Sequence, residues 1–163
     1  MEESSKSTGS DDAKSPADML RALFAMQSDL NDYVFSKNEI RASNGSELTM
    51  GAISEAALNG RLGVNDLPNQ WLQRYAEAMC SELNELQSDL LWKWWSKDRI
   101  DLQNIRVELI DILHFLISAM ISAGLTPERV FEIYQQKHAV NFNRQNSGYS
   151  QATKTEDDNR NIK

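Results

Sequence analysis

The sequence predicts an all-α fold, built as an antiparallel bundle of helices. Apolar residues recur at spacings of three and four in several stretches, which is the pattern of one face of a helix. No stretch shows the alternation of a β-strand. Helix boundaries are also marked: Gly124 is a good helix stop, and Thr126 followed by Pro127 is a good helix start.

Four long helices are expected. The first follows Asp18, a candidate cap, and its apolar positions are Met19, Leu23, Met26, Leu30 and Val34. The second runs from 70 to about 94, the third from about 104 to 123, and the fourth from Pro127 to before Gly148. Residues 36–69 contain many turn residues and predict a loop with one short helix near 53–58. A loop of this length favours a lid or an arm across a partner subunit.

Length and composition predict one domain over residues 17–149, between a disordered N-terminal tail (1–16) and a polar C-terminal tail (150–163). The net charge of −7 argues against polymeric nucleic acid and membrane surfaces as partners. The single cysteine, Cys80, allows no intrachain disulfide and favours a reducing, cytoplasmic setting. The apolar run from Ile110 to Leu125 is interrupted by Asp111 and is too short to span a membrane. The N-terminal residues lack the apolar core of a secretory signal.

Two pairs of carboxylates are the main chemical signal. Glu82 and Glu85 lie on the second predicted helix, and Glu108 and Asp111 lie on the third. In each pair the spacing of three places both acids on one helix face. The turn between the helices is short, so the helices should pack antiparallel and bring the four acids together. For Glu82 and Glu85 alone, a solvated surface pair is the ordinary interpretation.

Glu108 and Asp111 are less ordinary, because apolar residues flank them on every side of their helix. A helix that is apolar nearly all round is buried, and a buried carboxylate must be paired, protonated or bound to a metal. Pairing with Arg106, Lys97 or Arg99 in a buried ion-pair network is one alternative. Mg²⁺, which prefers oxygen ligands and is often shared with substrate phosphates, explains four converging acids more economically.

The end of the last predicted helix carries a basic, polar face. Lys137, Asn141 and Arg144 share this face, and Tyr149 adds a hydroxyl, which together suit phosphate oxygens. The alternative is a solvated helix end whose cations favour the helix dipole. Trp92, Trp94 and Trp95 are expected at the end of the second helix, in a cluster between helices or subunits. Lys93 lies among them and is a further candidate for phosphate contact. His114 is expected to be a core histidine bonded to backbone or to an acid.

These motifs, in this order, resemble a known family. The motifs are Glu82-Leu-Asn-Glu85, Trp92-Lys-Trp-Trp95, Val107-Glu-Leu-Ile-Asp111-Ile-Leu-His-Phe115 and Lys137-x-x-x-Asn141-x-x-Arg144-Gln-x-x-Gly148-Tyr149. They resemble the dimeric, all-α dUTPases, which belong with the MazG-like nucleotide pyrophosphatases, and the phage dCTP/dUTP pyrophosphatases look similar too. The resemblance covers about residues 70–149, with weaker support from 19–35.

The resemblance implies a homodimer that hydrolyses dUTP to dUMP and diphosphate, with dCTP to dCMP as a second candidate reaction. It implies that Mg²⁺ is held by Glu82, Glu85, Glu108 and Asp111. For the mechanism we expect two or more ions, with Glu85, or else Glu82, as the catalytic base. It also implies phosphate contacts from Lys137, Asn141, Arg144 and Tyr149, beside the candidate Lys93, and base contacts from Gln27, Asn31 and Trp71.

Two other functions remain open from the sequence. One is a MazG-type pyrophosphatase of broader or modified-nucleotide specificity. The other is a non-catalytic helical dimerisation module stabilised by a buried ion-pair network. Two departures from the family pattern leave base specificity open: His138 stands where the family often has Asn, and residues 38–68 match no family motif.

Overall fold

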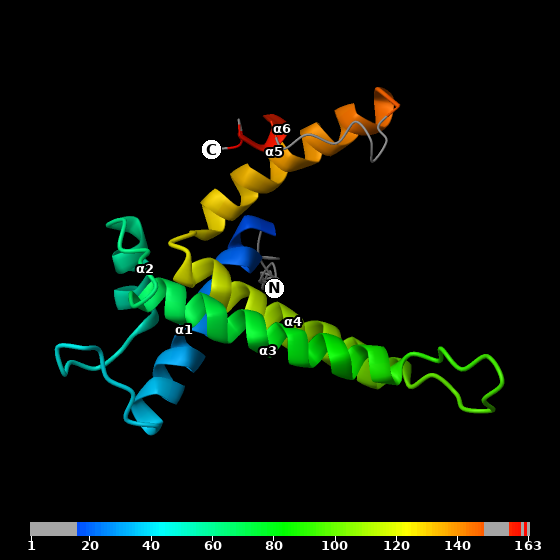
Figure 1. Cartoon of the computed structure of the whole chain (residues 1–163), viewed down its shortest axis with the longest axis horizontal. Coiled ribbons are helices and arrows are strands. Elements are labelled where there is room, and N and C mark those ends of the chain that lie inside the picture. The colour runs from blue at the N-terminus through cyan, green and yellow to red at the C-terminus, as the bar shows by residue number, and fades with distance from the viewer. Residues whose placement is uncertain (1–15, 149–156, 161, 163) are drawn as a thin grey trace, which may run out of the picture.

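The structure is a computed structural model that describes residues 16–148, 157–160 and 162 (Figure 1). The helices are α1 Pro16–Lys37, α2 Met50–Leu58, α3 Leu67–Asp89, α4 Leu102–Ser122, α5 Pro127–Asn146 and α6 Asp157–Arg160. Across these residues the only β-type pairing is an isolated bridge between Arg41 and Glu47. The predicted all-α fold is confirmed. Of the predicted N-terminal tail, Pro16 begins α1 and the rest lies outside the described residues, as do residues 149–156 at the other end.

α3 and α4 form a long antiparallel pair, as the short connection predicted (Figure 1). α1 and α2 pack against one end of this pair, and the hydrophobic core lies there. The opposite end, which carries the 90–101 loop, projects away from the core. The core residues come from α1, α2, α3 and α4 and from the loop before α2: Phe24, Phe35, Leu48, Met50, Ile53, Tyr75, Ile117, Ala119 and Ile121.

The segment before α3 packs into this core. Met50 and Ile53 have no exposed surface, and Leu48 is 2% exposed. The Thr49 side chain caps α2 by accepting a hydrogen bond from the Ala52 backbone N–H at 3.1 Å. The short helix is therefore confirmed, but a lid or arm is the wrong interpretation for residues 48–58. The prediction of a lid or arm was wrong because glycines lie at both ends of this short apolar helix, and glycines are typical of loops.

The tryptophan motif lies outside any helix. α3 ends at Asp89, and Leu90 is already extended. Trp92, Trp94 and Trp95 therefore lie in the loop and are mostly exposed, with Trp94 88% exposed. They contact one another edge to face, with ring centroids of Trp94 and Trp95 5.5 Å apart. Their predicted position at a helix end is wrong by several residues.

Burial along α4 is uneven. Its last six residues, Ile117 to Ser122, are almost wholly buried, whereas His114 and Leu116 just before them are exposed. Its first half lies beside α3 alone, and Leu109 and Ile110 are about half exposed (51% and 53%). The prediction of a helix buried all round thus holds, in the single chain, only for its last six residues.

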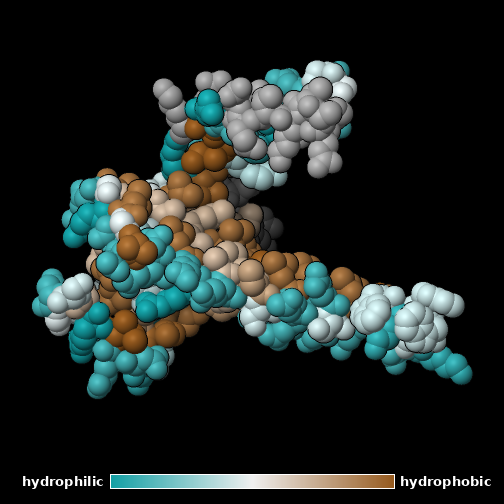
Figure 2. Space-filling view, viewed as in Figure 1, coloured by the Kyte–Doolittle hydropathy of each residue, from teal (hydrophilic) through white to brown (hydrophobic). Residues whose placement is uncertain are grey.

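α5 leaves the bundle at a steep angle (Figure 1). It packs against α1, where Arg21 Nε donates to Glu128 Oε1 at 2.6 Å, and against α6. Phe131, Tyr134 and Phe142 are exposed along it. Figure 2 shows apolar surface at the base of α5 and along the α3–α4 pair. In the described part of the chain no single helix passes the length and hydropathy test for a membrane span, although α4 and α5, bent by 102°, pass it as a pair.

Candidate active site

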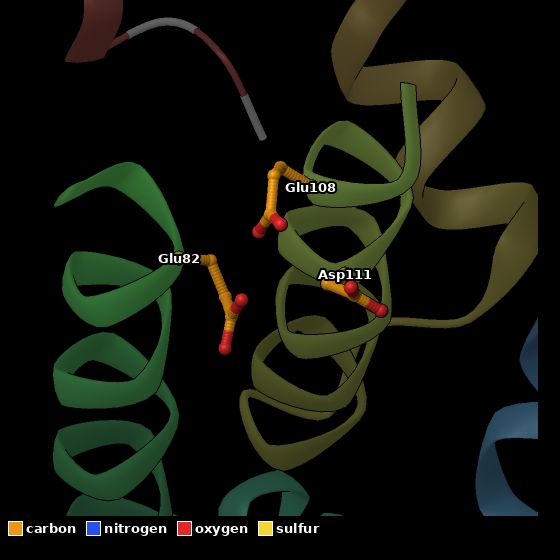
Figure 3. Close-up of side chains that lie close together, drawn as sticks. All are labelled: Glu82, Glu108 and Asp111. Atoms are coloured by element: carbon orange, nitrogen blue, oxygen red, sulfur yellow. The ribbon is translucent and has the colours of Figure 1, made fainter. Parts of the chain in front are cut away.

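Three of the four predicted acids meet between α3 and α4. One carboxylate oxygen each from Glu82, Glu108 and Asp111 lies within 4.8 Å of the other two. Glu82 comes from α3, and Glu108 and Asp111 lie one turn apart on α4. Figure 3 shows Glu82 and Glu108 extending toward each other from the two helices. The spacing of three and the antiparallel pairing therefore produce the predicted convergence for these three residues, here called the acid cluster.

The acid cluster is electrostatically strained. Glu108 is only 8% exposed. Burial raises the pKa of its carboxyl above the usual 4.5, and the charges of Glu85, Asp89, Glu82 and Asp111 raise this pKa further. Both causes disfavour the ionised form of Glu108.

No cation of the described chain compensates the acid cluster. The ion pairs seen between described residues, such as Arg21 with Glu128 and Arg129 with Glu132, include none of the three acids. Arg106, Lys97 and Arg99, the partners considered from the sequence, form no such pair with these acids. The buried ion-pair network therefore lacks its cations. Three convergent carboxylates without a cation are a donor set that fits a divalent ion preferring oxygen ligands.

Glu85 and Asp89 lie close to the acid cluster without joining it. Glu85 is exposed and is not among the three converging acids, although its charge acts on Glu108. Asp89, which the sequence analysis missed, shares the α3 face of Glu82 because it lies seven residues further on. The Asn104 side-chain amide donates to both Asp89 Oδ2 and Glu108 Oε1, the latter at 3.3 Å. The helical spacing of Asp89 was a usable signal, whereas nothing in the sequence singled out Asn104.

A pocket of about 610 Å³ adjoins the acid cluster, and Asp111 lines it. The predicted base-binding residues Gln27, Asn31 and Trp71 all line this pocket. Gln27 and Asn31 are buried, and Gln27 Nε2 donates to Asn31 Oδ1 at 3.1 Å. The rest of the wall is mainly apolar: Leu30, Val34, Phe35, Asn38, Ile40, Tyr75, His114 and Phe115. The structure thus brings the predicted base-binding side chains to one cavity, next to a predicted metal ligand.

His114 is also part of this pocket. Its Nδ1 lies 2.5 Å from Gln27 Oε1, and the residue is exposed toward the cavity side. The prediction of a core histidine bonded to backbone or to an acid is wrong, because its side-chain partner is an amide. The spacing of three from Asp111 would have placed both residues on one face of α4.

The predicted phosphate-binding residues are not gathered at the acid cluster. Lys137, Asn141 and Arg144 lie on α5, which packs on α1 and α6, and Lys137 donates to Asn159 of α6. Lys93 lies in the 90–101 loop with its Nζ 5.2 Å from the centre of the Trp92 ring. Tyr149 lies outside the described residues.

An all-α fold with an acid cluster beside an amide-lined pocket has the features of the all-α nucleotide pyrophosphatase class. The family model described as dUTPase matches residues 19–130, which contain the acid cluster and the whole pocket. The chain therefore belongs to the dUTPase family. The match ends before Lys137, so the basic face of α5 lies beyond it.

Among curated proteins, the chain is 31% identical over 80 residues to a dCTP pyrophosphatase of Enterobacteria phage T4, covering 49% of this chain and 40% of the relative. It is 31% identical over 91 residues to a dCTP pyrophosphatase of Enterobacteria phage LZ5, covering 56% and 46%. A DNA replication protein of Enterobacteria phage T4 is 28% identical over 74 residues, covering 44% and 16%. The matched segments span less than half the length of these relatives. No solved structure matches the chain.

Proposed function

We propose that the chain is a metal-dependent pyrophosphohydrolase of pyrimidine deoxynucleoside triphosphates, converting dUTP to dUMP and diphosphate, with dCTP as a second substrate. The observation that carries the proposal is that Asp111 belongs both to the acid cluster and to the amide-lined pocket. A nucleotide has the matching layout, with a base at one end and a charged phosphate chain at the other. Membership of the dUTPase family and the similarity to two phage dCTP pyrophosphatases support this assignment.

The pocket is suited to the base. Trp71 and Phe115 supply apolar surface for an aromatic ring, and the buried amides of Gln27 and Asn31 supply donors and acceptors. Buried amides discriminate strongly, because a base that does not match them leaves polar groups unpaired. With the base among these residues, the phosphates extend toward Asp111 and the acid cluster.

The acid cluster is proposed to hold two or more Mg²⁺ ions, with Glu82, Glu108 and Asp111 as ligands. Bound there, Mg²⁺ would neutralise phosphate charge and make the phosphorus more electrophilic. Glu85 is exposed beside the cluster, and we assign it as the general base in preference to Glu82, because it is free of the three-residue cluster. In the reaction a water oxygen bonds to the α-phosphorus while the bond from that phosphorus to the oxygen shared with the β-phosphorus breaks. Diphosphate leaves with that oxygen, and Glu85 accepts one proton of the water.

Lys93, Lys137, Asn141, Arg144 and Tyr149 remain the proposed phosphate contacts, on the basis of their chemistry and motif. A homodimer is proposed as well, because the single chain leaves apolar residues of α1 and α5 exposed. The lone cysteine supports a reducing, cytoplasmic location.

The direct test is hydrolysis of a panel of nucleotides, with and without Mg²⁺, followed by chromatography of the products. We expect dUTP and dCTP to yield the monophosphate and diphosphate, and we expect EDTA to abolish the reaction. Equal cleavage of dATP and dGTP would support a broader MazG-type enzyme instead. Release of no product from any triphosphate would point to a helical dimerisation module and refute the proposed activity.

A further inference from the structure

We propose that Ser118 is a positioning residue that decides which pyrimidine the pocket prefers. It does so by fixing the orientation of the Asn31 and Gln27 side-chain amides. This inference rests on the proposed function, since it concerns the base of the same nucleotide. Ser118 lies on α4 with no exposed surface, beneath the pocket rather than in its wall.

The Ser118 hydroxyl has a defined direction. Its Oγ lies 2.9 Å from the backbone carbonyl oxygen of His114, one turn earlier on α4. A carbonyl oxygen can only accept, and a hydroxyl has a single proton to donate. The proton of Ser118 is therefore used toward His114, and Ser118 Oγ is an acceptor for every other neighbour.

The direction of the Ser118 hydrogen bond also fixes the orientation of the Asn31 and Gln27 side-chain amides. Asn31 Nδ2 lies 2.9 Å from Ser118 Oγ and must donate to it, so Asn31 Oδ1 faces Gln27. Gln27 Nε2 donates to that oxygen at 3.1 Å, so Gln27 Oε1 faces His114 Nδ1 at 2.5 Å. His114 Nδ1 then carries a proton and donates. The four hydrogen bonds thus form a ring that starts at His114 Nδ1, passes through Gln27, Asn31 and Ser118, and ends at the carbonyl oxygen of His114. Each residue donates to the next one, and the direction is fixed because the carbonyl oxygen can only accept.

The orientation of these amides matters because uracil and cytosine have opposite patterns on the same edge. Uracil offers a donor at N3 and an acceptor at position 4, whereas cytosine offers an acceptor at N3 and a donor at position 4. Turning a side-chain amide by half a turn exchanges its donor and its acceptor. An amide pair locked in one orientation therefore favours one base, and the same pair in the other orientation favours the other base.

Removing the hydroxyl should release this lock. In Ser118→Ala the Asn31 Nδ2 group loses its acceptor. The direction of the hydrogen bonds among Asn31, Gln27 and His114 is then no longer fixed. Both amide orientations become accessible, so the ratio of kcat/KM for dUTP and dCTP should move toward one by about tenfold, the size expected for one buried hydrogen bond. A purely structural loss would lower both rates and leave the ratio unchanged.

The chain provides a matched control. Ser122 lies one turn further along α4, has no exposed surface, and donates to the Ser118 carbonyl oxygen at 2.9 Å. It has the same residue type, the same helix and the same kind of backbone hydrogen bond, but Asn31 donates to Ser118 and not to Ser122. Ser122→Ala should therefore lower the melting temperature by a similar amount without changing the substrate ratio.

The experiment measures kcat/KM for both nucleotides, together with the Kd values of dUMP and dCMP, in the parent, Ser118→Ala, Ser118→Thr and Ser122→Ala proteins. In the parent we expect a clear preference for one of the two nucleotides, and in Ser118→Ala we expect a ratio of the two kcat/KM values near one. Ser122→Ala and Ser118→Thr, which retains a hydroxyl at position 118, should keep the ratio of the parent. Should Ser118→Ala fail to fold, Ser118→Cys, whose thiol is only a weak donor and a weak acceptor, should move the ratio in the same direction by a smaller amount.

An unchanged ratio in folded Ser118→Ala or Ser118→Cys would overturn the inference, as would an equal change in Ser122→Ala or a parent ratio near one. These results would leave the proposed activity standing. Failure of the parent to hydrolyse either nucleotide would instead refute the proposed function, and this inference with it.

Discussion

Glu108 is the single residue on which the acid cluster most depends. It is buried, and its pKa is raised by burial and by four neighbouring acids. Glu108→Gln keeps the shape of the side chain but removes its charge. We expect turnover to fall by about 100-fold or more, the size found when one electrostatic group of an active site is lost. In EDTA we expect a higher melting temperature than in the parent, because one source of repulsion is gone.

The same residue predicts a pH dependence. Since the folded state raises the pKa of Glu108, protonation stabilises the fold below the usual value of 4.5, and that stabilisation is lost as the pH rises through the folded-state pKa. The metal-free parent therefore carries the cost of the charge at neutral pH, whereas Glu108→Gln does not. The difference in melting temperature should be largest near neutral pH and shrink as the pH falls toward 4.5. A difference that is constant with pH would contradict this account.

Asn104 is predicted to support the acid cluster without binding a metal itself. Its amide donates to both Asp89 and Glu108 and so joins the end of α3 to α4. Residues that orient metal ligands commonly contribute 10- to 100-fold in metal affinity or activity. Asn104→Ala should therefore need about tenfold more Mg²⁺ for half-maximal activity, measured by titrating Mg²⁺ at saturating nucleotide. Gln103→Ala, at the exposed neighbouring position, should leave the Mg²⁺ requirement unchanged, and an unchanged requirement in Asn104→Ala would refute the role.

These residues also show what the sequence could predict. Glu82, Glu108 and Asp111 were found because acids spaced by three share a helix face, whereas Gln27 and Asn31 were found through the resemblance to a known family. Asn104 and Ser118 were missed because their roles depend on contacts between helices. Glu85 was placed with the other acids by its spacing, but it lies at the exposed margin of that face.

At the scale of elements, the helix boundaries followed local signals. α4 ends where Gly124 adopts a φ of +76°, with the Leu125 backbone N–H donating to the Met120 carbonyl oxygen at 3.0 Å. The end of α3 was predicted too late, because the apolar residues up to Trp94 continue the helical spacing of the residues before them. In the single chain Trp92, Trp94 and Trp95 are mostly exposed, so no packing extends the helix to them. The position of α5 could not be predicted, since nothing local fixes the angle at which a helix leaves a bundle.

The turn at Gly124 carries a stability prediction. A Cβ at this position would lie 3.2 Å from two carbon atoms of Leu58, and the left-handed conformation itself costs about 1–2 kcal/mol for other residues. Gly124→Ala should lower the free energy of unfolding by at least this cost, as measured by urea denaturation. Gly60→Ala is the control, because Gly60 has a φ of +71° with nothing within 4 Å of the added atom. The two variants should differ by the contact with Leu58, and equal losses would show that this contact is not limiting.

At the scale of the whole molecule, the distribution of apolar surface supports the proposed homodimer. α1 has a buried face that contains Phe24 and Phe35, yet its other face exposes Met19, Leu23, Met26 and Leu30 at helical spacing. α4 and α5 add exposed residues, among them Leu109, Ile110, Phe131 and Phe142. Many large apolar residues exposed on one chain are typical of a subunit interface, and the symmetric dimer is the most common oligomer.

The dimer is expected to depend on the exposed face of α1. Met26 is 66% exposed in the single chain, so a charge there costs the isolated subunit little, but it would be desolvated in an interface. Met26→Glu should therefore shift the mass measured by light scattering from dimer to monomer at micromolar concentrations while the helical circular dichroism is retained. Lys37→Glu, which places the same charge at the end of the same helix, should remain dimeric. Because the acid cluster and the pocket lie within one chain, monomeric Met26→Glu should still bind dUMP. Loss of dUMP binding together with dimerisation would show instead that the second copy completes the pocket.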